Sequence, residues 1–371
     1  MKIIPVNEPL LNGKEKDYLI KCIETGWISS EGFFVKEFEK QFSKRMGRKH
    51  GISVCNGSAA LDIAISVLNI EPGDEVILPT FTIISCAASI IRAGAIPVLV
   101  DCDSKTWNMN TEQIEEKITD KTKAIMVVHI YGLPVDMAPV LGLSEKYGIA
   151  IIEDAAESHG LTYREKPCGC FGDISTFSFY PNKHVTTGEG GMLLTDSDKL
   201  ATNCRSLRNL CFQPQKRFVH EKLGWNMRMS NLQAAVGLAQ LDRLEEFVRR
   251  KREMGRRYSE LLSDIPGIQL PLPETEYARN IYWVYGLVLE NDIPFDAPEA
   301  MRRLAEHNIG TRPFFWPMHE QPIFKKMGLF KNQHYPNAEK IGRRGYYIPS
   351  GLAITDEQIR RVAAAIRKVI I

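Results

Sequence analysis

Between residues 51 and 155 the chain alternates short apolar runs with stretches of helical spacing, and this alternation limits the fold more than any other feature. The runs are apolar throughout, which is typical of strands whose two faces are both covered. Repeated strand–helix–strand units predict an α/β fold with an open, doubly wound, mostly parallel sheet. The expected strands are 51–55, 75–79, 96–101, 124–132 and 150–155, and the expected helices are 58–68, a segment after Thr82, 111–118 and a segment ending near 147.

After residue 160 the spacing of apolar residues changes. A long helix is expected to begin near Ser230, because leucine and valine recur three or four residues apart at positions 238, 241, 244 and 248. We therefore predict a large sheet domain over residues 1–245 and a smaller C-terminal α+β domain over residues 246–371. The remaining expected elements are strands at 173–180, 191–196 and 281–290, a helix after Pro298 and a final helix from Asp356.

The 371 residues carry a net charge of +2, so the composition does not indicate a nucleic-acid or membrane partner. No apolar run suits a signal peptide or a membrane span. Cys168 and Cys170 lack a second pair, so no metal site is predicted, and we expect a cytoplasmic protein with reduced thiols. Six cations crowd residues 249–257, but interleaved Glu253 and the nearby Glu245 favour a solvated helix face over a nucleic-acid patch.

Ligands of open α/β sheets bind beyond the carboxyl ends of the strands. Gly57 and Ser58 follow the first expected strand and open a helix. Gly57 lets the backbone approach a ligand closely, Ser58 can cap the helix, and the free N–H groups of the helix can hold a phosphate. The same residues can also form a simple turn and cap, so this feature leaves the phosphate site open.

Asp154 stands at the end of another expected strand, after an apolar run. A buried carboxylate needs a partner. A protonated pyridine nitrogen would serve, because the ion pair keeps the ring an electron sink. A local arginine or backbone amide would serve equally well, so both interpretations stay open.

Lys183 lies in the most informative stretch, residues 175–191. A strand leads to Ser178 and then to Lys183, and glycines follow at 188, 190 and 191. Small neighbours let a lysine reach a flat cofactor, and a desolvated site helps the amine to lose its proton. Ser178 is placed to bind a phosphate oxygen. The alternative is a surface loop with a solvated lysine.

Together these motifs resemble the DegT/DnrJ/EryC1/StrS family of sugar-nucleotide aminotransferases, which have the fold-type I pyridoxal-phosphate-dependent fold. The resemblance covers almost the whole chain. Single motifs are weak, whereas the set is specific. It comprises residues 27–32, 56–61, 79–82, 129–132, 153–157, 175–191, 224–229 and 348–350.

The resemblance implies a role for each matching residue. Lys183 matches the Schiff-base lysine, Asp154 the partner of the pyridinium nitrogen, and Glu157 a residue near the 3-hydroxyl of the cofactor. Asn226 matches an asparagine that reaches the phosphate from a neighbouring subunit, which implies a homodimer with shared active sites. The phosphate site is implied at Gly57, Ser58, Ala59 and Ser178.

The chain departs from the family pattern at Ile83, where many members stack an aromatic ring on the cofactor. Phe81 and Phe33 are the candidates to compensate. Segments 311–319 and 216–228 resemble those of members that aminate GDP-linked sugars, so GDP-4-keto-6-deoxy-D-mannose is the expected acceptor. The expected substrate-binding residues are Phe81, His220, Arg228, Arg312, Phe314 and His319; for two of the three aromatic residues 314–316, core packing is at least as good an interpretation.

The resemblance implies transamination, with L-glutamate as donor and pyridoxamine phosphate formed between the two half-reactions. Lys183 would act as general base and then as general acid. A histidine in its place would indicate a sugar dehydratase, and His184 follows directly. Other open alternatives are a UDP- or dTDP-sugar acceptor, a sensor that only binds the cofactor, and a phosphate-binding fold without cofactor. Lipopolysaccharide O-antigen synthesis is the expected use of the product.

Overall fold

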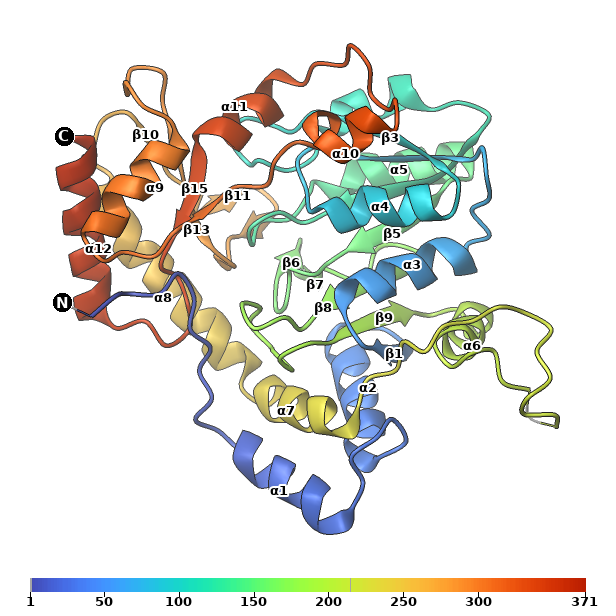
Figure 1. The fold of residues 1–371 in the computed structure, drawn as a ribbon. Coiled ribbons are helices and arrows are strands. Elements are labelled where there is room, and N and C mark those ends of the chain that lie inside the picture. Colours follow the sequence, from blue (N-terminus) through green and yellow to red (C-terminus); the bar gives the residue numbers. More distant parts are fainter. Residues whose placement is uncertain (1, 214) are drawn as a thin grey trace.

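The computed structural model describes residues 2–213 and 215–371. Its centre is a seven-stranded sheet between two layers of helices (Figure 1). Only β9 runs against its neighbours, so the sheet is mostly parallel, as predicted. The strands lie in the order β1 (His50–Val54), β9 (Gly191–Thr195), β8 (Ile174–Ser178), β5 (Ala150–Asp154), β4 (Thr122–Val128), β2 (Glu75–Pro79) and β3 (Ile96–Val100).

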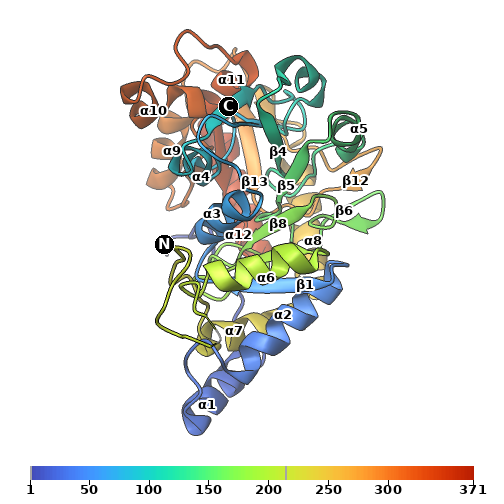
Figure 2. The same cartoon turned by 90° about the vertical axis from the view of Figure 1, so that its right-hand side faces the viewer.

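Both faces of the sheet are covered, because successive side chains of a strand point to opposite faces. Val76 and Leu78 of β2 belong to one buried cluster, and Ile77 between them belongs to another. This explains why the strands are apolar throughout. The first cluster includes α3 (Gly57–Val67), α4 (Ile84–Arg92) and α6 (Asp198–Leu207); the second includes α2 (Phe33–Arg45), α5 (Met137–Tyr147) and α7 (Asn231–Leu241), against which α1 (Glu15–Thr25) packs (Figure 2).

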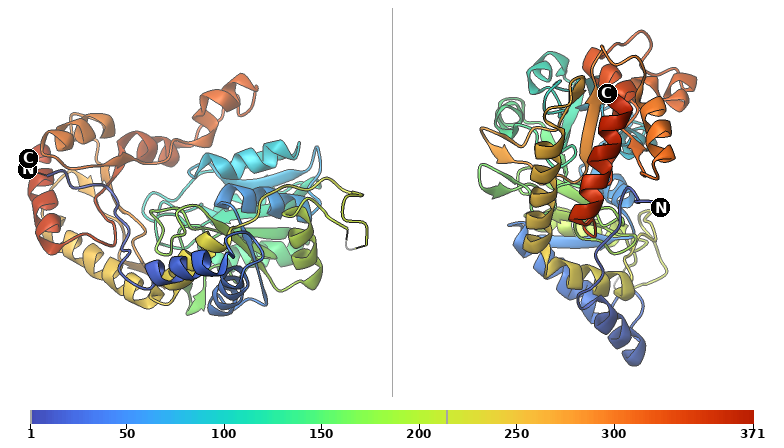
Figure 3. Two further views of the ribbon diagram at one scale, coloured as in Figure 1. Left: turned by 60° about the horizontal axis from the view of Figure 1, so that its bottom comes forward. Right: turned by 90° about the vertical axis from the view of Figure 1, so that its left-hand side faces the viewer.

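The C-terminal segment builds a second unit around its own core, which also takes up Ile4 from the start of the chain. Ile4 pairs with Ile309, so the N-terminal segment lies on this unit (Figure 3). A four-stranded sheet has the order β10 (Ile268–Gln269), β13 (Tyr285–Leu289), β15 (Gly345–Ile348) and β14 (Arg312–Pro313). The helices are α8 (Leu244–Leu262), α9 (Ala297–Glu306), α10 (Pro322–Lys326), α11 (Pro336–Arg344) and α12 (Asp356–Ile370).

The predicted division at residue 245 falls within the first turn of α8, and it stays a prediction. Short elements complete the fold. They are the 3-10 turns η1 (Thr111–Gln113), η2 (Glu115–Lys117) and η3 (Met318–Glu320), and the hairpins β6 (Thr162–Tyr163) with β7 (Lys166–Pro167) and β11 (Glu274–Thr275) with β12 (Ala278–Arg279). Across the described residues, no helix combines the length and apolarity that crossing a membrane requires.

Three expected elements differ from the structure. Residues 111–118 form the 3-10 turns η1 and η2 instead of an α-helix; Ile114 is buried there, and Ile118 packs partly buried against the same core cluster. The helix expected from Ser230 begins correctly, with Ser230 as its N-cap in a capping box, but it ends at Leu241 and α8 follows. The strand expected at 281–290 is shorter, because Tyr282 has a φ of 49°.

Candidate active site

A cavity of about 520 Å³ opens at the carboxyl ends of the central strands, where the α/β topology predicts a ligand. The sheet domain supplies most of its wall, and three aromatic side chains of the C-terminal unit supply the rest. The residues that line it are Asn56, Gly57, Ser58, Leu61, Thr82, Ile83, Ser85, Val128, Asp154, Ala156, Glu157, Thr176, Phe177, Ser178, Tyr180, Asn182, Lys183, Glu189, Trp283, Phe315 and Tyr347.

The start of α3 forms one end of the cavity. Asn56 caps this helix by accepting a hydrogen bond from the Ala59 amide at 2.8 Å, so Ser58 is not the cap that the sequence suggested. Ser58 lies inside the first turn, and its hydroxyl pairs with that of Ser85 at 2.8 Å. The first amides of a helix have no partner within it, so those of Gly57 and Ser58 are suited to an anion. A Cβ added to Gly57 would lie only 2.9 Å from the Cβ of Ser178, so glycine lets the two segments meet.

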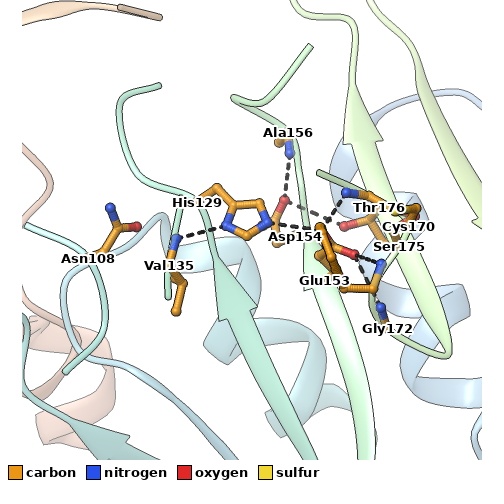
Figure 4. A network of polar contacts seen from close by, with 12 residues as sticks. Asn108, His129, Val135, Glu153, Asp154, Ala156, Cys170, Gly172, Ser175 and Thr176 are labelled. Carbon is orange, nitrogen blue, oxygen red and sulfur yellow. Dashed lines mark hydrogen bonds and ion pairs between the residues drawn. The ribbon is translucent and has the colours of Figure 1, made fainter. Parts of the chain in front are cut away.

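Asp154, at the end of β5, lines the cavity and is only 2% exposed. Its Oδ1 accepts hydrogen bonds from the amide of Ala156 at 3.1 Å and from the hydroxyl of Thr176 at 3.5 Å (Figure 4). Its Oδ2 accepts one from the Cys86 thiol at 3.2 Å. Within residues 2–213 and 215–371, no lysine or arginine forms an ion pair with it, so burial raises the pKa of this carboxyl.

Lys183 reaches the same cavity from the other side. Its Nζ lies 3.6 Å from Oε1 of Glu157 and 3.9 Å from the ring centroid of Trp283. Burial lowers the pKa of the Lys183 amine, against the opposing effect of Glu157 and Asp154. His184 is buried away from the cavity and lies 3.3 Å from the carbonyl oxygen of Ile281. Lysine, and not its neighbouring histidine, therefore faces the reaction space.

Glu157 links this lysine to the turn that follows β4. Its Oε2 accepts a hydrogen bond from the amide of Tyr131 at 2.8 Å. Burial raises the pKa of the Glu157 carboxyl to about 7, although the nearby Lys183 pulls it down. The Glu157 carboxyl can therefore take up a proton near neutral pH beside the lysine amine, which is a useful property for a site that moves protons.

Behind the cavity, Glu153 points to the opposite face of β5 from Asp154 (Figure 4). Nδ1 of His129 accepts from the Val135 amide at 3.1 Å, which places the ring proton on Nε2, 3.0 Å from Glu153. Burial alone would raise the pKa of Glu153, but the hydrogen bonds from His129 and from backbone amides hold this pKa below its ordinary value. Backbone amides of Gly169, Phe171 and Gly172 complete its hydrogen bonds. This network fixes the end of β5 and hence the place of Asp154.

Three predicted substrate-binding residues lie in the packed interior and do not line the cavity. Phe81 and Phe314 pack against each other with ring centroids 5.9 Å apart, and both are at most 3% exposed. His319 is bonded at both ring nitrogens, to the Thr80 hydroxyl at 2.9 Å and to Glu339 at 3.0 Å. Phe81 is thus not available to stack in place of Ile83, which lines the cavity itself.

Several further predicted residues also lie outside the cavity lining. Arg312 is exposed on β14, and His220 is exposed with Nδ1 2.8 Å from the carbonyl oxygen of Leu210. Asn226 is also exposed, and Nε of Arg228 donates to its side-chain oxygen at 3.0 Å. Ala59 is buried in α3, and its amide is already bonded to Asn56. Phe33, the second candidate for ring stacking, is 67% exposed on α2.

Sequence reasoning missed the aromatic wall formed by Trp283, Phe315 and Tyr347. Trp283 also donates from Nε1 to the carbonyl oxygen of Asn182 at 2.9 Å, which holds the residue before Lys183. These side chains come from β15 and two loops far along the chain, so no local spacing connects them with the lysine. Among residues 314–316, Phe314 is core, Phe315 lines the cavity, and Trp316 is 42% exposed.

The donor set suits pyridoxal phosphate. Helix amides and Ser178 suit a phosphate, the unpaired buried Asp154 suits a protonated ring nitrogen, and Lys183 with its lowered pKa suits imine formation. The fold and these residues together define a pyridoxal-phosphate-dependent enzyme of the aminotransferase type.

Comparison with known proteins is consistent with this class. The sequence profile of the DegT/DnrJ/EryC1/StrS aminotransferase family matches residues 9–367, and the chain belongs to this family. The chain is 39% identical to GDP-perosamine synthase of Escherichia coli O157:H7, over 99% of each sequence. It is 40% identical to GDP-perosamine synthase of Caulobacter vibrioides, over 99% of this chain and 98% of the relative. The crystal structure of the aminotransferase TlmJ from Streptoalloteichus hindustanus superposes with a TM-score of 0.92 at 28% identity, covering 99% of this chain and 98% of that one.

Proposed function

We propose that the protein transfers the amino group of L-glutamate to the C4 ketone of GDP-4-keto-6-deoxy-D-mannose, giving GDP-perosamine. The observation that carries the proposal is a cavity-lining Lys183 in a chain that matches GDP-perosamine synthases from end to end. We also propose a cytoplasmic location and a role of the product in lipopolysaccharide O-antigen synthesis. The proposed location rests on the free cysteines, and the proposed role of the product rests on the sequence resemblance.

Each of the residues around the cavity would have its own role in this reaction. Bound pyridoxal phosphate supplies an electron sink for the carbon from which the proton is removed. Lys183 would move that proton as general base and then as general acid, with Glu157 holding its amine in place. Asp154 would keep the ring nitrogen protonated. The amides that open α3 and the Ser178 hydroxyl would bind the phosphate.

The aromatic wall gives the acceptor sugar a surface on the lysine side of the cavity. Trp283 and Tyr347 together with Phe315 can exclude water from the reacting carbon. Arg312 remains a proposed contact, whereas Phe314 is packed in the core. Tyr347 pairs with Arg312 across β14 and β15, which keeps that arginine near the aromatic wall.

The direct test supplies purified enzyme and pyridoxal phosphate with L-glutamate and one keto-sugar nucleotide at a time. Mass spectrometry of the GDP-, dTDP- and UDP-linked 4-keto-6-deoxy sugars would show which one gains an amino group. The proposal expects the GDP-linked sugar to react with the highest kcat/KM, and Lys183→Ala to be inactive. If only a dTDP- or UDP-linked sugar reacts, the proposed acceptor is wrong, but the proposed transamination is still correct.

The rival functions give different results in the same assay. A dehydratase would remove the sugar's 3-hydroxyl without adding nitrogen. A sensor would bind the cofactor, with visible absorbance, but would not respond to glutamate. A fold without cofactor would develop no visible absorbance with pyridoxal phosphate.

We propose further that the active enzyme is a homodimer in which Asn226 serves the partner's cavity. In support, Asn226 is exposed and lies outside the cavity lining of its own chain. The segment around it carries large exposed apolar side chains, with Phe218 80% and Leu223 94% exposed, and it extends from the body of the molecule (Figure 1). Such groups are typical of a surface that a second subunit covers.

Subunit mixing tests this arrangement. Alone, the Lys183→Ala protein should be inactive and the Asn226→Ala protein should be weakly active. A mixed dimer contains one cavity with both wild-type residues, so mixing and re-association should restore activity above either parent. If each cavity uses its own Asn226, the mixture will show no gain.

A further inference from the structure

Cys86 touches the carboxylate that faces the cavity. Its Sγ lies 3.2 Å from Oδ2 of Asp154, while the two other donors, Ala156 and Thr176, contact Oδ1. Cys86 is fully buried in the first turn of α4 and does not itself line the cavity. Oδ2 therefore has this thiol as its polar partner among the described residues.

The direction of this hydrogen bond can be assigned. Burial, together with the neighbouring Asp154, holds the pKa of the Cys86 thiol well above its usual range, so it keeps its proton. A thiol has one proton, and an ionised carboxylate only accepts. The Thr82 hydroxyl, 3.5 Å from Sγ, must then donate to the sulfur. Thr82, in the cavity wall, thus donates to Cys86, and Cys86 donates to Asp154.

We infer that Cys86 is a positioning residue, which orients Asp154 and moderates its basicity toward the ring nitrogen of the cofactor. An S–H group is a weak donor. It fixes the carboxylate while leaving most of its acceptor strength for the pyridinium. The inference rests on the pyridoxal-phosphate site and not on the identity of the sugar.

Two substitutions of nearly equal size separate hydrogen bonding from packing. Cys86→Ala removes the donor, whereas Cys86→Ser replaces it with a hydroxyl of similar volume. If the thiol only filled space, both variants would behave alike. If its proton matters, serine should rescue what alanine loses. Cys204→Ala and Cys204→Ser, at a fully buried cysteine of α6 that does not line the cavity, are the matched controls.

The first measurement is the dissociation constant of pyridoxal phosphate, from the visible absorbance of titrated apoprotein. Cys86→Ala should bind roughly 3- to 10-fold more weakly, which is the size of one hydrogen bond, and Cys86→Ser should stay near wild type. Both Cys204 variants should bind like wild type.

The second measurement needs no bound cofactor. Losing a donor raises the pKa of Asp154 further, so the apoprotein of Cys86→Ala should lose thermal stability up to a higher pH than wild type, and serine should reverse this. Equal cofactor affinities for the alanine and serine variants, or unchanged pH profiles in both, would overturn the inference. If wild type fails to bind pyridoxal phosphate, the cofactor site itself is wrong and the inference falls with it.

Discussion

The Nζ atom of Lys183 lies 3.9 Å from the centroid of the Trp283 ring, and the same indole donates its N–H to the carbonyl oxygen of Asn182. One side chain of the C-terminal unit thus holds both the amine of the reactive lysine and the backbone that carries it. The C-terminal unit is therefore part of the chemical site as well as a cover for the substrate.

Replacing Trp283 should separate these two contacts. Trp283→Phe keeps an aromatic ring near Nζ and loses the bond to Asn182, whereas Trp283→Leu loses both. We expect the leucine variant to lower kcat/KM by about 10- to 100-fold, as misplacement of a reacting group does, and the phenylalanine variant to fall between it and wild type. Steady-state kinetics with saturating pyridoxal phosphate would check this, and equal effects of the two variants would contradict it.

Gly57→Ala should weaken binding of the cofactor phosphate. The added Cβ would come within 2.9 Å of the Cβ of Ser178. Ser178 would then be pushed away from the first turn of α3, and the two parts of the phosphate site would separate. We expect the dissociation constant of pyridoxal phosphate to rise about tenfold, equal to about 1.4 kcal/mol. Gly142→Ala is the matched control, because an added Cβ in α5 meets nothing within 4 Å. Similar affinities of the two variants would argue against this phosphate site.

The pKa of Glu157, raised to about 7, predicts how stability of the apoprotein depends on pH. A carboxyl whose folded-state pKa exceeds its unfolded value binds its proton more tightly when folded. Its contribution to stability is therefore lost as pH rises from about 4.5 through about 7. Glu157→Gln should remove this loss, on the order of 3 kcal/mol across the window. Thermal melts between about pH 5 and about pH 8 would show a flatter profile, and an unchanged slope would contradict the assignment.

His319→Ala should change stability more than substrate binding. Both ring nitrogens are bonded within the protein, and the change leaves the buried Thr80 hydroxyl without that partner. We expect a loss of about 1–3 kcal/mol in the free energy of unfolding, with KM for the sugar nucleotide unchanged. Chemical denaturation and kinetics on the same preparation separate the outcomes. A raised KM with unchanged stability would restore His319 as a substrate contact.

The central sheet could be predicted because its strands are short apolar runs buried on both faces, as at residues 75–79. Leu241 and Leu244 show where such patterns fail. They continue one apolar spacing, yet the chain turns at Asp242 and Arg243, and both leucines stay buried in separate helices. Apolar spacing predicts which side chains are buried, but not whether the helix between them is continuous.

The sequence likewise predicts some residues of the candidate site and not others. Lys183, Asp154 and Ser178 follow strands of one sheet, so topology brings their strand ends together and the sequence predicts them. Trp283 and Tyr347 reach the cavity only because the C-terminal unit packs against the sheet domain. The sequence does not single out Cys86, because one buried thiol in an apolar helix carries no pattern; its role follows only from its contact with Asp154.

The N-terminal segment, which pairs through Ile4 with Ile309, also has Lys2 bonded to Arg361 of α12, ten residues before the last residue, Ile371. Ten residues of helix span about 15 Å, so a short flexible linker could join the two ends. A chain closed in this way and opened at the exposed turn of Gly73 should preserve the packing of both units. The fold would then tolerate circular permutation, and a split reporter built on it could be cut before the amino end of β2, whereas the reactive lysine lies at the carboxyl ends of the strands.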